Sequence, residues 1–514
     1  MNVVQLFQAQ AEAQPNAPAL IEGRGRHRRV TTFAELEAAS STGAARLRSL
    51  GLAPGDAVLL LVPLSADLYR VLASVFRAGL VAIVLDPSAG REHIARCCAM
   101  RPPDAFIGIP KAHLLRLMVP AVRRIPRQLV ADGWAPGAKR FEKGADALAP
   151  VEVDAEAPAL LTFTSGTTGQ PKAAIRTHGI LSAQHAALAA ALELAPGQID
   201  FATLPVVVLA SLASGVTTVL PDTDLRQPGA FDTGPVLDQI RVEHPTRTAA
   251  SPAFIERLLG AAASGDLNSF KRIDMGGAPV FPKLLNRVQA TGSQAVGVYG
   301  STEAEPIADL VAAHLSDADR QRIRAGEGLP VGRPVPHVEV RVITDQWGTP
   351  LGPFSSQQWD TLELAPGTVG EIVVAGDHVV PGYLNGIGDL ETKVEVDGRR
   401  WHRTGDAGRL DADGRLWLLG RCASASRRLE SVVYPLQVEA ALSELTDARA
   451  AFLEVDEKRV VVVEGDGDLG AIQEAVAWAD LDVIERVAQI PRDRRHNAKV
   501  DVPALRALLA RSRV

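Results

Sequence analysis

Two apolar strands with an amphipathic helix between them constrain the fold of the first half of the chain more than any other feature. The segments "DAVLLLVP" (56–63) and "VAIVLDP" (81–87) are short, continuous apolar runs, which are typical of buried strands. The segment between them, "SADLYRVLASVFRAG" (65–79), has apolar residues at helical spacing. A strand, a helix and a strand in this order indicate parallel strands joined by a crossover helix, and "RPPDAFIGIP" adds one more short strand. We therefore predict an α/β fold with a parallel sheet.

The second half of the chain has a different texture. Residues 340–425 contain short strands separated by Gly and Asp-Gly turns, a pattern that indicates an antiparallel meander or a small barrel. From about residue 421 the pattern changes again to a small α+β unit. This unit has a strand at "KRVVVVEG" and helices near 436–445, 471–480 and 503–511. The change in texture places a boundary near Gly420 and Arg421.

Composition limits the class of protein. A chain of 514 residues indicates two to four structural units, and the net charge of −6 argues against nucleic acid or an anionic membrane as the main partner. The three cysteines lack the spacing of a metal or disulfide site, and the adjacent pair Cys97 and Cys98 is expected to be buried in a helix. We expect a cytoplasmic protein with no signal peptide and no membrane span.

A small polar loop in "LTFTSGTTGQPKAAIRTHG" (161–179) carries the first chemical signal. Its close glycines allow backbone N–H groups to converge on an anion, and its Ser and Thr hydroxyls add further donors. Lys172 follows with a mobile positive charge. The spacing differs from that of the P-loop nucleoside triphosphatases. On composition alone the loop is either a polyphosphate site or a mobile surface loop.

A second signal lies in "GVYGSTEAEPIA" (297–308), after a strand-like run. Tyr299 is suited to stack on a flat base, Thr302 to donate to a phosphate oxygen and Glu303 to bind a magnesium ion. Without further context a turn with one structural glutamate is the simpler interpretation. Nearby, the paired glycines of "DMGGAP" (274–279) would bring the backbone close to a flat group.

Two further polar segments follow towards the C-terminus. In "WHRTGDAGRLDADGRLWLLGR" (401–421), Asp406 is suited to accept hydrogen bonds from a pair of ribose hydroxyls, and Arg421 ends the next hairpin within reach of the same sugar. In "IPRDRRHNAKVD" (490–501), Lys499 lies in a polar turn before the last helix. Alone, Lys499 would be interpreted as a surface lysine.

In this order the motifs resemble those of the adenylate-forming superfamily, which includes acyl-CoA synthetases, peptide-synthetase adenylation domains and luciferases. The resemblance covers nearly the whole chain, since 30–63 resembles the N-terminal opening of the family and 327–343 its later core. It implies a large N-terminal domain (1–420) of two α/β subdomains plus a small barrel, which binds ATP and the acid. A small mobile α+β C-terminal domain (421–514) would follow as a lid that rotates between two half-reactions.

The resemblance also implies a role for each matching position. The residues that would wrap the ATP phosphates are Thr164, Ser165, Gly166, Thr167, Thr168, Gly169 and Lys172. Those that would flank the adenine are Gly277, Ala278, Pro279 and Tyr299, and those that would hold the ribose are Asp406 and Arg421. The implied catalytic residues are Thr302 near the α-phosphate, Glu303 on Mg²⁺ and Lys499, which would bridge the acid's carboxylate, the ribose and the α-phosphate. The carboxylate itself would be the nucleophile.

Some positions depart from the family pattern. Ala173 and Ala174 follow the lysine of the loop, where the family usually has Gly. In "LPVVVLASLASG" the family often has an aromatic residue followed by His, whereas this chain has Val207, Val208 and Leu209. The acid pocket is therefore expected to be wide and apolar.

The largest departure follows Arg421. The family usually has an Asp at the hinge and then a glycine-centred turn that commonly lines the pantetheine tunnel of CoA ligases. Here Ala423 takes the hinge position and Glu430 lies near the turn glycine, which puts thioester formation in doubt. This region, with "LPVVVLASLASGVTTVLPDTD" and "AFIGIP", is similar to the β-lactone synthetases of bacterial olefin biosynthesis, whose substrate's own hydroxyl closes the ring.

The resemblance therefore implies an acyl-CoA ligase-type enzyme that activates a bulky hydrophobic carboxylic acid through an acyl-AMP intermediate. Its cofactors would be ATP, Mg²⁺ and CoA, with CoA receiving the acyl group as the commonest acceptor across the superfamily. The alternatives are a β-lactone synthetase, an enzyme specialised for one half-reaction, and a non-catalytic ligand-binding relative.

Overall fold

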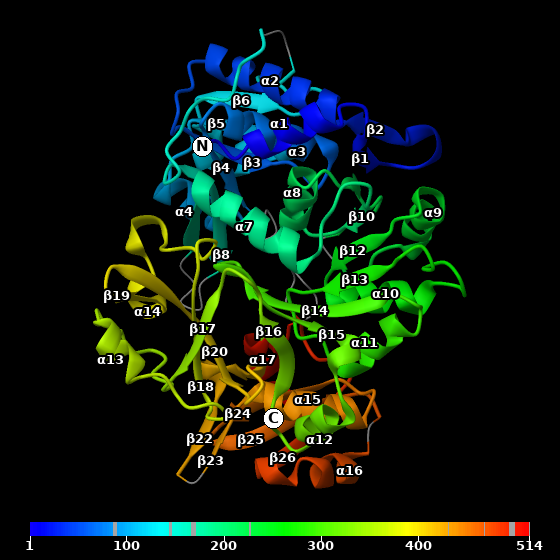
Figure 1. The fold of residues 1–514 in the computed structure, drawn as a ribbon, viewed down its shortest axis with the longest axis vertical. Coiled ribbons are helices and arrows are strands. Elements are labelled where there is room, and N and C mark those ends of the chain that lie inside the picture. Colours follow the sequence, from blue (N-terminus) through cyan, green and yellow to red (C-terminus); the bar gives the residue numbers. More distant parts are fainter. Residues whose placement is uncertain are drawn as a thin grey trace. The chain divides into compact units, whose positions relative to one another are not determined.

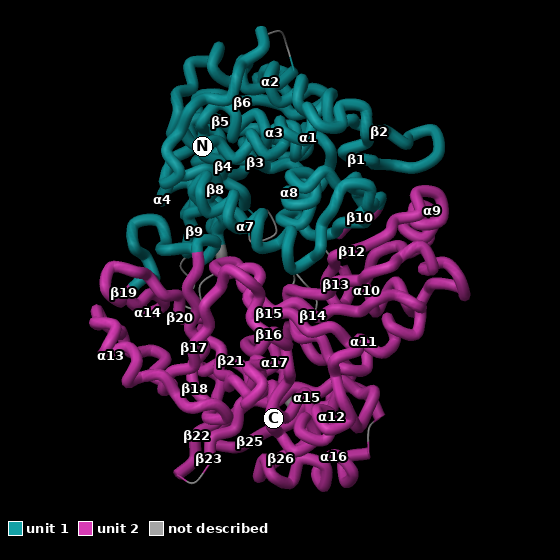
Figure 2. The backbone as a smooth tube through the Cα atoms, in the orientation of Figure 1, with its two compact units in different colours: residues 1–222, 377–389 teal, residues 223–376, 390–514 magenta. Residues whose placement is uncertain are grey.

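The chain folds into two compact units, each discontinuous in sequence (Figure 1; Figure 2). The computed structural model describes residues 1–85, 90–142, 146–165, 171–225, 228–429, 431–466, 468–492 and 499–512. Unit 1 contains residues 1–222 and 377–389, and unit 2 contains residues 223–376 and 390–514. The predicted boundary at residue 420 is not one of these divisions, since unit 2 includes residues on both sides of it. That boundary stays a prediction.

A mainly parallel sheet forms the larger part of unit 1. Its strand order is β7 (Lys139–Arg140), β6 (Arg127–Val130), β5 (Ala105–Gly108), β3 (Ala57–Leu61), β4 (Val81–Val84), β8 (Pro158–Ser165) and β9 (Pro171–Thr177). Only the pair of β8 and β9 is antiparallel. Helix α3 (Ala66–Arg77) connects β3 to β4 and buries most of its length. The predicted strand, helix and strand are confirmed to within a few residues at each end.

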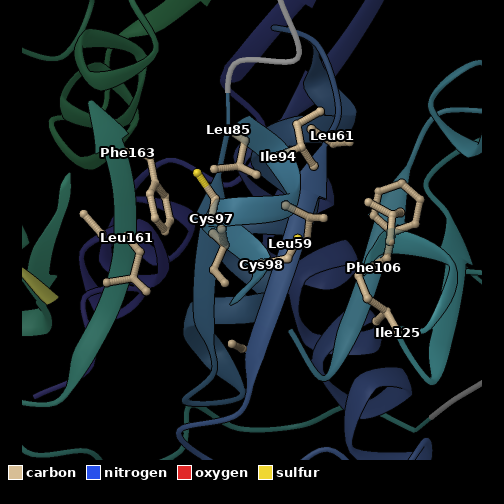
Figure 3. Packing of buried hydrophobic residues seen from close by; sticks show 14 of the residues in the cluster. Leu59, Leu61, Leu85, Ile94, Cys97, Cys98, Phe106, Ile125, Leu161 and Phe163 are labelled. Carbon is tan, nitrogen blue, oxygen red and sulfur yellow. The ribbon is translucent and has the colours of Figure 1, made fainter. Parts of the chain in front are cut away.

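The apolar side chains of this sheet form a closely packed core (Figure 3). Leu59, Leu61 and Phe106 from the strands pack against helix α4 (Arg91–Met100), which contributes Cys97 and Cys98. Burial raises the pKa of the Cys97 thiol to about 12 and that of the Cys98 thiol to about 11. Both sulfurs therefore act as small apolar groups, as predicted from the sequence.

Unit 1 also contains a shorter set of strands with their own helices. The strands are β10 (Ile199–Ala202), β11 (Thr217–Val219), β1 (Pro18–Glu22) and β2 (Arg29–Thr32), in this order. The remaining helices are α1 (Gln5–Ala13), α2 (Phe33–Ser49), α5 (Leu115–Met118), α6 (Pro120–Arg123), α7 (His178–Ala191) and α8 (Pro205–Ala213). Helix α2 begins with a capping box, in which Thr32 accepts from the backbone of Glu35 and the glutamate accepts in return.

Unit 2 contains one sheet that changes from parallel to antiparallel pairing. The order is β12 (Arg247–Ala250), β13 (Arg272–Met275), β14 (Gln294–Ser301), β15 (Ala304–Val311), β16 (Leu329–Pro334), β21 (Leu416–Arg421), β20 (Arg399–Leu410), β18 (Gly370–Ala375) and β17 (Glu339–Ile343), with β19 (Lys393–Val396) paired to β20. The first three strands are parallel and the others antiparallel. The helices are α9 (Thr233–Glu243), α10 (Pro252–Ala261), α11 (Pro282–Gln289), α12 (Asp317–Arg324), α13 (Ser356–Asp360) and α14 (Asp389–Thr392). The predicted meander is confirmed, and among the described residues these strands do not close into a barrel.

The C-terminal part of unit 2 is the predicted α+β arrangement. It contains the hairpin of β22 (Ser426–Arg428) and β23 (Ser431–Val433), and a sheet of β24 (Ala450–Val455), β25 (Lys458–Glu464) and β26 (Val483–Val487). Its helices are α15 (Pro435–Leu445), α16 (Leu469–Ala475) and α17 (Val502–Ser512). The expected strand forms, as do the helices near 436–445 and 503–511, whereas the helix expected near 471–480 ends at Ala475 and is followed by a 3₁₀ turn at Ala477–Ala479. No helix in the described residues is long and apolar enough to cross a membrane.

Candidate active site

Two side chains of unit 2 meet at the Asp406 carboxylate. The Tyr299 hydroxyl, on β14, donates to Oδ2 of Asp406 at 2.8 Å. Nη1 of Arg421 lies 3.2 Å from Oδ1 of the same carboxylate. Asp406 and Arg421 are register partners on β20 and β21, so strand pairing alone keeps them together. The structure thus joins three residues that the sequence placed on the base and the ribose of a nucleotide.

The strand that carries Asp406 is fixed by buried polar contacts. Arg403 and Glu371 form a fully buried pair in which Nε donates to Oε1 at 2.8 Å. Thr404 donates to the Ile372 carbonyl at 2.9 Å, and its hydroxyl accepts from the Asp406 backbone N–H at 3.0 Å. These bonds join β20 to β18. The Asp406 carboxylate therefore projects from a rigid strand, as a preorganised binding site requires.

Electrostatics keep the two donors protonated. Burial, followed by the nearby Asp406 carboxylate, raises the pKa of Tyr299 above its usual value. The same carboxylate raises the pKa of Arg421, with smaller contributions from Tyr299 and Glu303. A neutral phenol and a guanidinium cation therefore face one carboxylate. About half of the Arg421 side chain remains exposed, at 59%, so the guanidinium is accessible to a ligand.

Thr302 and Glu303 form the tip of the hairpin between β14 and β15. Both are half-buried, and the Glu303 backbone N–H donates to the Ser301 hydroxyl at 3.3 Å. The Glu303 carboxylate is among the groups that raise the pKa of Arg421. Among the described residues no three His, Cys, Asp or Glu side chains gather around a possible metal ion.

A buried Lys-His pair also belongs to this region and was missed in the sequence. Lys393 begins β19 opposite His402 on β20, with Nζ at 3.2 Å from Nδ1. Burial, followed by the Lys393 ammonium, lowers the pKa of His402 to about 3, although the Glu303 carboxylate opposes this shift. The ring is therefore neutral at physiological pH. A lysine in an alternating strand pattern is normally interpreted as solvent-facing, so only the tertiary packing identifies it.

The turn after β13 holds the predicted adenine-flanking backbone. Gly277, Ala278 and Pro279 follow Met275 at the carboxyl end of this parallel strand. Gly277 has a φ of +83°, which only glycine adopts readily. Tyr299 is on the neighbouring strand β14. The adenine role of these residues stays a prediction.

In unit 1 the phosphate-loop prediction falls partly outside the described residues. Gly166, Thr167, Thr168 and Gly169 are not described, while Thr164 and Ser165 end strand β8. Thr164 pairs with Lys172 across the β8–β9 ladder.

The side chain of Lys172 has a defined environment in unit 1. Its ammonium lies 5.8 Å from the ring centroid of Tyr383, a cation–π distance. A Cβ at Gly388, whose φ is +99°, would lie 2.6 Å from the Lys172 Nζ atom. The positive φ favours glycine at 388, and any larger residue there would also displace the end of the Lys172 side chain. The segment 377–389 returns to unit 1 and packs beside the lysine, a partnership that the sequence did not indicate.

The alanines that follow Lys172 are core residues. Ala173 and Ala174 are both fully buried in β9. Ala173 pairs with Phe163 in the sheet core, and Ala174 packs against Val380 and Tyr383. A methyl group at each position fills core space, which explains why Ala is accommodated where the family usually has Gly.

The remaining departures from the family pattern lie after Arg421 and in helix α8. Ala423 is exposed in the short 3₁₀ turn after Arg421, while Glu430 lies outside the described residues. Lys499 is exposed in a bend just before helix α17, so its catalytic role stays a prediction.

Val207 and Val208 are buried in α8, and Leu209 lines an apolar cavity of about 30 Å³ together with α1 and α7. That volume suits one or two waters and not a bulky acid, so the acid pocket also stays a prediction.

Comparison with known proteins identifies the family. The sequence pattern of the AMP-binding enzyme family matches residues 7–384, and the chain belongs to this family. It is 32% identical over 501 residues to an olefin β-lactone synthetase of Stenotrophomonas maltophilia, covering 91% of this chain and 89% of the relative. It is 30% identical over 429 residues to an indoleacetate–CoA ligase of Aromatoleum aromaticum, with 81% and 78% covered.

A solved structure shares the fold. The amide bond synthetase McbA from Marinactinospora thermotolerans superposes with a TM-score of 0.81 at 23% identity, over 99% of this chain and 100% of McbA. The predicted α/β fold, adenylate-forming family and likeness to β-lactone synthetases are confirmed. The chain is an AMP-forming acid ligase by family.

Proposed function

We propose that this enzyme joins ATP to an apolar carboxylic acid as an acyl-adenylate, and that the acid's own β-hydroxyl then displaces AMP to form a β-lactone. The adenylation step is carried by one observation, the meeting of Tyr299 and Arg421 at the Asp406 carboxylate. A carboxylate fixed on strand β20 and flanked by an aromatic ring and a cation suits a nucleoside. The hydroxyls of the ribose donate to Asp406, and Tyr299 with the turn at 277–279 flanks the base.

The resemblance to the family assigns the phosphates to the segment 164–172 and to Thr302. Lys172 supplies a cation, and the preceding residues 164–169 supply hydroxyl and backbone donors. Thr302 donates to the α-phosphate. Glu303 is the one protein ligand that we assign to Mg²⁺, which offsets triphosphate charge and stabilises the pyrophosphate leaving group when bound. Placing the reaction in the cytoplasm is supported by the free, buried cysteines Cys97, Cys98 and Cys422.

In the first step a carboxylate oxygen of the acid forms a bond to the α-phosphorus, and the bond to pyrophosphate breaks. Lys499 neutralises the charge that accumulates on the phosphorus oxygens. In the second step the β-hydroxyl oxygen bonds to the acyl carbon, AMP leaves with the electron pair of the broken C–O bond, and the hydroxyl proton passes to solvent. Both steps balance with ATP as the only co-substrate.

Two observations support ring closure. The segment where CoA ligases commonly have a glycine-centred turn forms the hairpin β22–β23, and its Arg427 is tied to Asp345 while Arg428 is tied to Asp480. The relatives that cover most of this chain include olefin β-lactone synthetases. Transfer to CoA is the second candidate, supported by the 30% identity to indoleacetate–CoA ligase.

Pyrophosphate exchange into ATP tests the adenylation step. Apolar acids of increasing chain length should each be tested with wild-type protein and with Lys499→Met, which keeps the side-chain length and removes the charge. We expect acid-dependent exchange in the wild type and its loss in the variant. Absence of exchange with every acid would reject adenylation and leave either a ligand-binding relative or an enzyme of the second half-reaction only.

Product mass identifies the acceptor. A β-hydroxy acid and its deoxy counterpart form a matched pair, each incubated with ATP in the presence and absence of CoA. We expect the hydroxy acid to lose the mass of one water without CoA, while the deoxy acid yields only adenylate. A thioester from both acids would favour the CoA ligase. Turnover of presynthesised acyl-adenylate, without any from acid and ATP, would identify an enzyme of the second half-reaction only.

A further inference from the structure

The segment 111–140 of unit 1 has a charge opposite to that of the whole chain. It contains seven Lys and Arg residues and a single acidic residue, Asp132, whereas the chain carries a net charge of −6. Arg127 is used internally, since its guanidinium donates to the carbonyls of Leu50 and Gly51. The other basic side chains are exposed or half-exposed. The positive charge is therefore presented at the surface.

Large apolar side chains are exposed in the same segment. Leu114, Leu117 and Met118 are 56%, 79% and 41% exposed, and their spacing places them on one side of the turn and helix formed by 112–118. Trp134 is 67% exposed in the loop between β6 and β7. Side chains of this size are usually buried, so four within one short segment indicate a surface that is covered in use.

The apolar residues lie close together because of the sheet topology. Strands β5 and β6 are parallel neighbours, so the segments that follow them leave the same edge of the sheet. The first segment contains α5 and the second contains Trp134. Arg116 on α5 joins them, because its Nη1 donates to the Pro136 carbonyl at 2.7 Å and its guanidinium packs against Gly137.

We define the basic apolar face by its exposed residues, which are Lys111, Leu114, Leu117, Met118, Arg123, Arg124, Trp134, Lys139 and Arg140. The combination of Trp, Leu and Met with Lys and Arg is the composition of segments that lie in a membrane interface. Tryptophan favours the headgroup level, and the basic side chains favour anionic lipids. A nucleic acid would match the charges but would leave the aliphatic side chains exposed.

We propose that the basic apolar face docks unit 1 onto an anionic lipid surface. Charge complementarity selects this occupant, because the local positive charge occurs in an otherwise acidic chain. Strand β8 ends at Ser165 on the same edge of the sheet, four strands from β6, a distance of about 19 Å at about 4.8 Å per strand. The docking is independent of the proposed lactone chemistry and concerns where an apolar acid is taken up.

Vesicle cosedimentation of the full-length protein tests the proposal. The probes are vesicles of phosphatidylcholine alone and of equal parts of phosphatidylcholine and phosphatidylglycerol. We expect binding to the anionic vesicles only, with loss of most binding at a salt concentration that shortens the Debye length to about 3 Å. Arg123→Gln with Arg124→Gln should weaken partitioning about 25-fold, from about fivefold per basic residue.

A second variant examines the apolar part, and matched controls exclude general effects. Leu117→Ser with Trp134→Ser should lower binding to anionic vesicles. The double variant should also abolish the blue shift of tryptophan fluorescence that accompanies insertion. The controls are Val242→Ser, an exposed apolar residue elsewhere, and Lys458→Gln with Arg287→Gln, which remove the same charge from unit 2. Controls should bind like the wild type.

Several results would overturn the proposal. Equal binding to neutral and anionic vesicles, equal loss in the controls, or no sedimentation with anionic vesicles at low salt would each do so. The last result would leave an acidic protein as the occupant of this face. All variants lie outside the predicted adenylation residues, so unchanged pyrophosphate exchange in solution is the expected check that they fold.

Discussion

Asp406→Asn is the sharpest test of the nucleotide site, because it keeps the shape of the side chain and removes its charge. The Asp406 carboxylate accepts from Tyr299 at 2.8 Å and pairs with Arg421 at 3.2 Å. The ion pair is worth about 0–1 kcal/mol, since the Arg421 side chain is 59% exposed and solvent screens it. The main effect on ATP binding must therefore come from the ribose bonds.

The magnitude follows from the change in acceptor. Hydrogen bonds to a charged group contribute about 1.5–3 kcal/mol each, and those between neutral groups about 0.5–1.5 kcal/mol. Two ribose hydroxyls that donate to Asp406 would each lose about 1–1.5 kcal/mol in the Asn variant, or about 2–3 kcal/mol together. This loss corresponds to an ATP dissociation constant about 30 to 150 times that of the wild type.

Calorimetric titration with ATP measures this constant, and thermal unfolding of the same samples checks the fold. Tyr299→Phe serves as the matched control, since it removes one donor to the carboxylate and keeps the charge. We expect a loss of tenfold or less from this variant, and a double variant that loses less than the sum because both residues share one bond. An Asp406→Asn protein that is well folded and binds ATP within threefold of the wild type would refute the ribose assignment.

Three further predictions concern other parts of the chain. Lys499→Ala should slow adenylation by about 10²–10³, the effect of removing one preorganised charge stabiliser, while ATP affinity in titrations stays unchanged; equal losses in rate and affinity would contradict this. Gly388→Ala should weaken ATP binding and lower stability by about 1 kcal/mol or more, because the methyl group meets the Lys172 ammonium and the backbone has φ of +99°; calorimetry and urea unfolding measure both. Burial lowers the pKa of His178 from 6.5 to about 4, so below pH 6.5 the unfolded chain binds a proton that the folded protein does not. The free energy of unfolding should therefore fall by about 2 kcal/mol between about pH 7 and about pH 5. His178→Gln should flatten that part of the urea-unfolding profile, and an unchanged slope would exclude His178 as its source.

The local sequence pattern was sufficient to predict individual strands and helices whose apolar residues are buried. The predicted strand 56–63 became Ala57–Leu61 and the predicted helix 65–79 became Ala66–Arg77, because continuous apolar runs and helical spacing each have one compact solution. The meander of unit 2 was also predictable from its turns. The pairing of distant strands was not, since β16 pairs with β21 over a long separation that no local signal encodes.

The candidate site was predicted unevenly for a physical reason. Tyr299, Asp406 and Arg421 lie in polar motifs of the sequence, so their chemistry could be predicted before their proximity was known. Lys393 and His402 were missed, because an alternating strand gives no sign that a lysine is only 8% exposed. Tyr383 beside Lys172 was missed as well, since its segment returns to unit 1 from a distant part of the sequence.

The departures from the family pattern fall into two groups, according to the reaction step that each would affect. Ala173 fills core space beside Lys172, and Tyr299 and Arg421 both contact Asp406, so these described positions are compatible with the adenylation roles that we propose. The departures that remain, Ala423 and the hairpin of β22 and β23, lie where the resemblance to CoA ligases implies the entry of an external thiol. An internal hydroxyl needs no entry path, because it is bound together with the carboxylate and reacts at a high effective concentration. Ring closure therefore tolerates the loss of an acceptor tunnel, whereas thioester formation does not.

If the product proves to be a thioester, the hairpin must open. Asp345→Ala, which releases Arg427 and Tyr434, should then raise the rate with CoA. On the proposed lactone chemistry the same variant should leave the rate with a β-hydroxy acid unchanged, so this one substitution distinguishes the two acceptors.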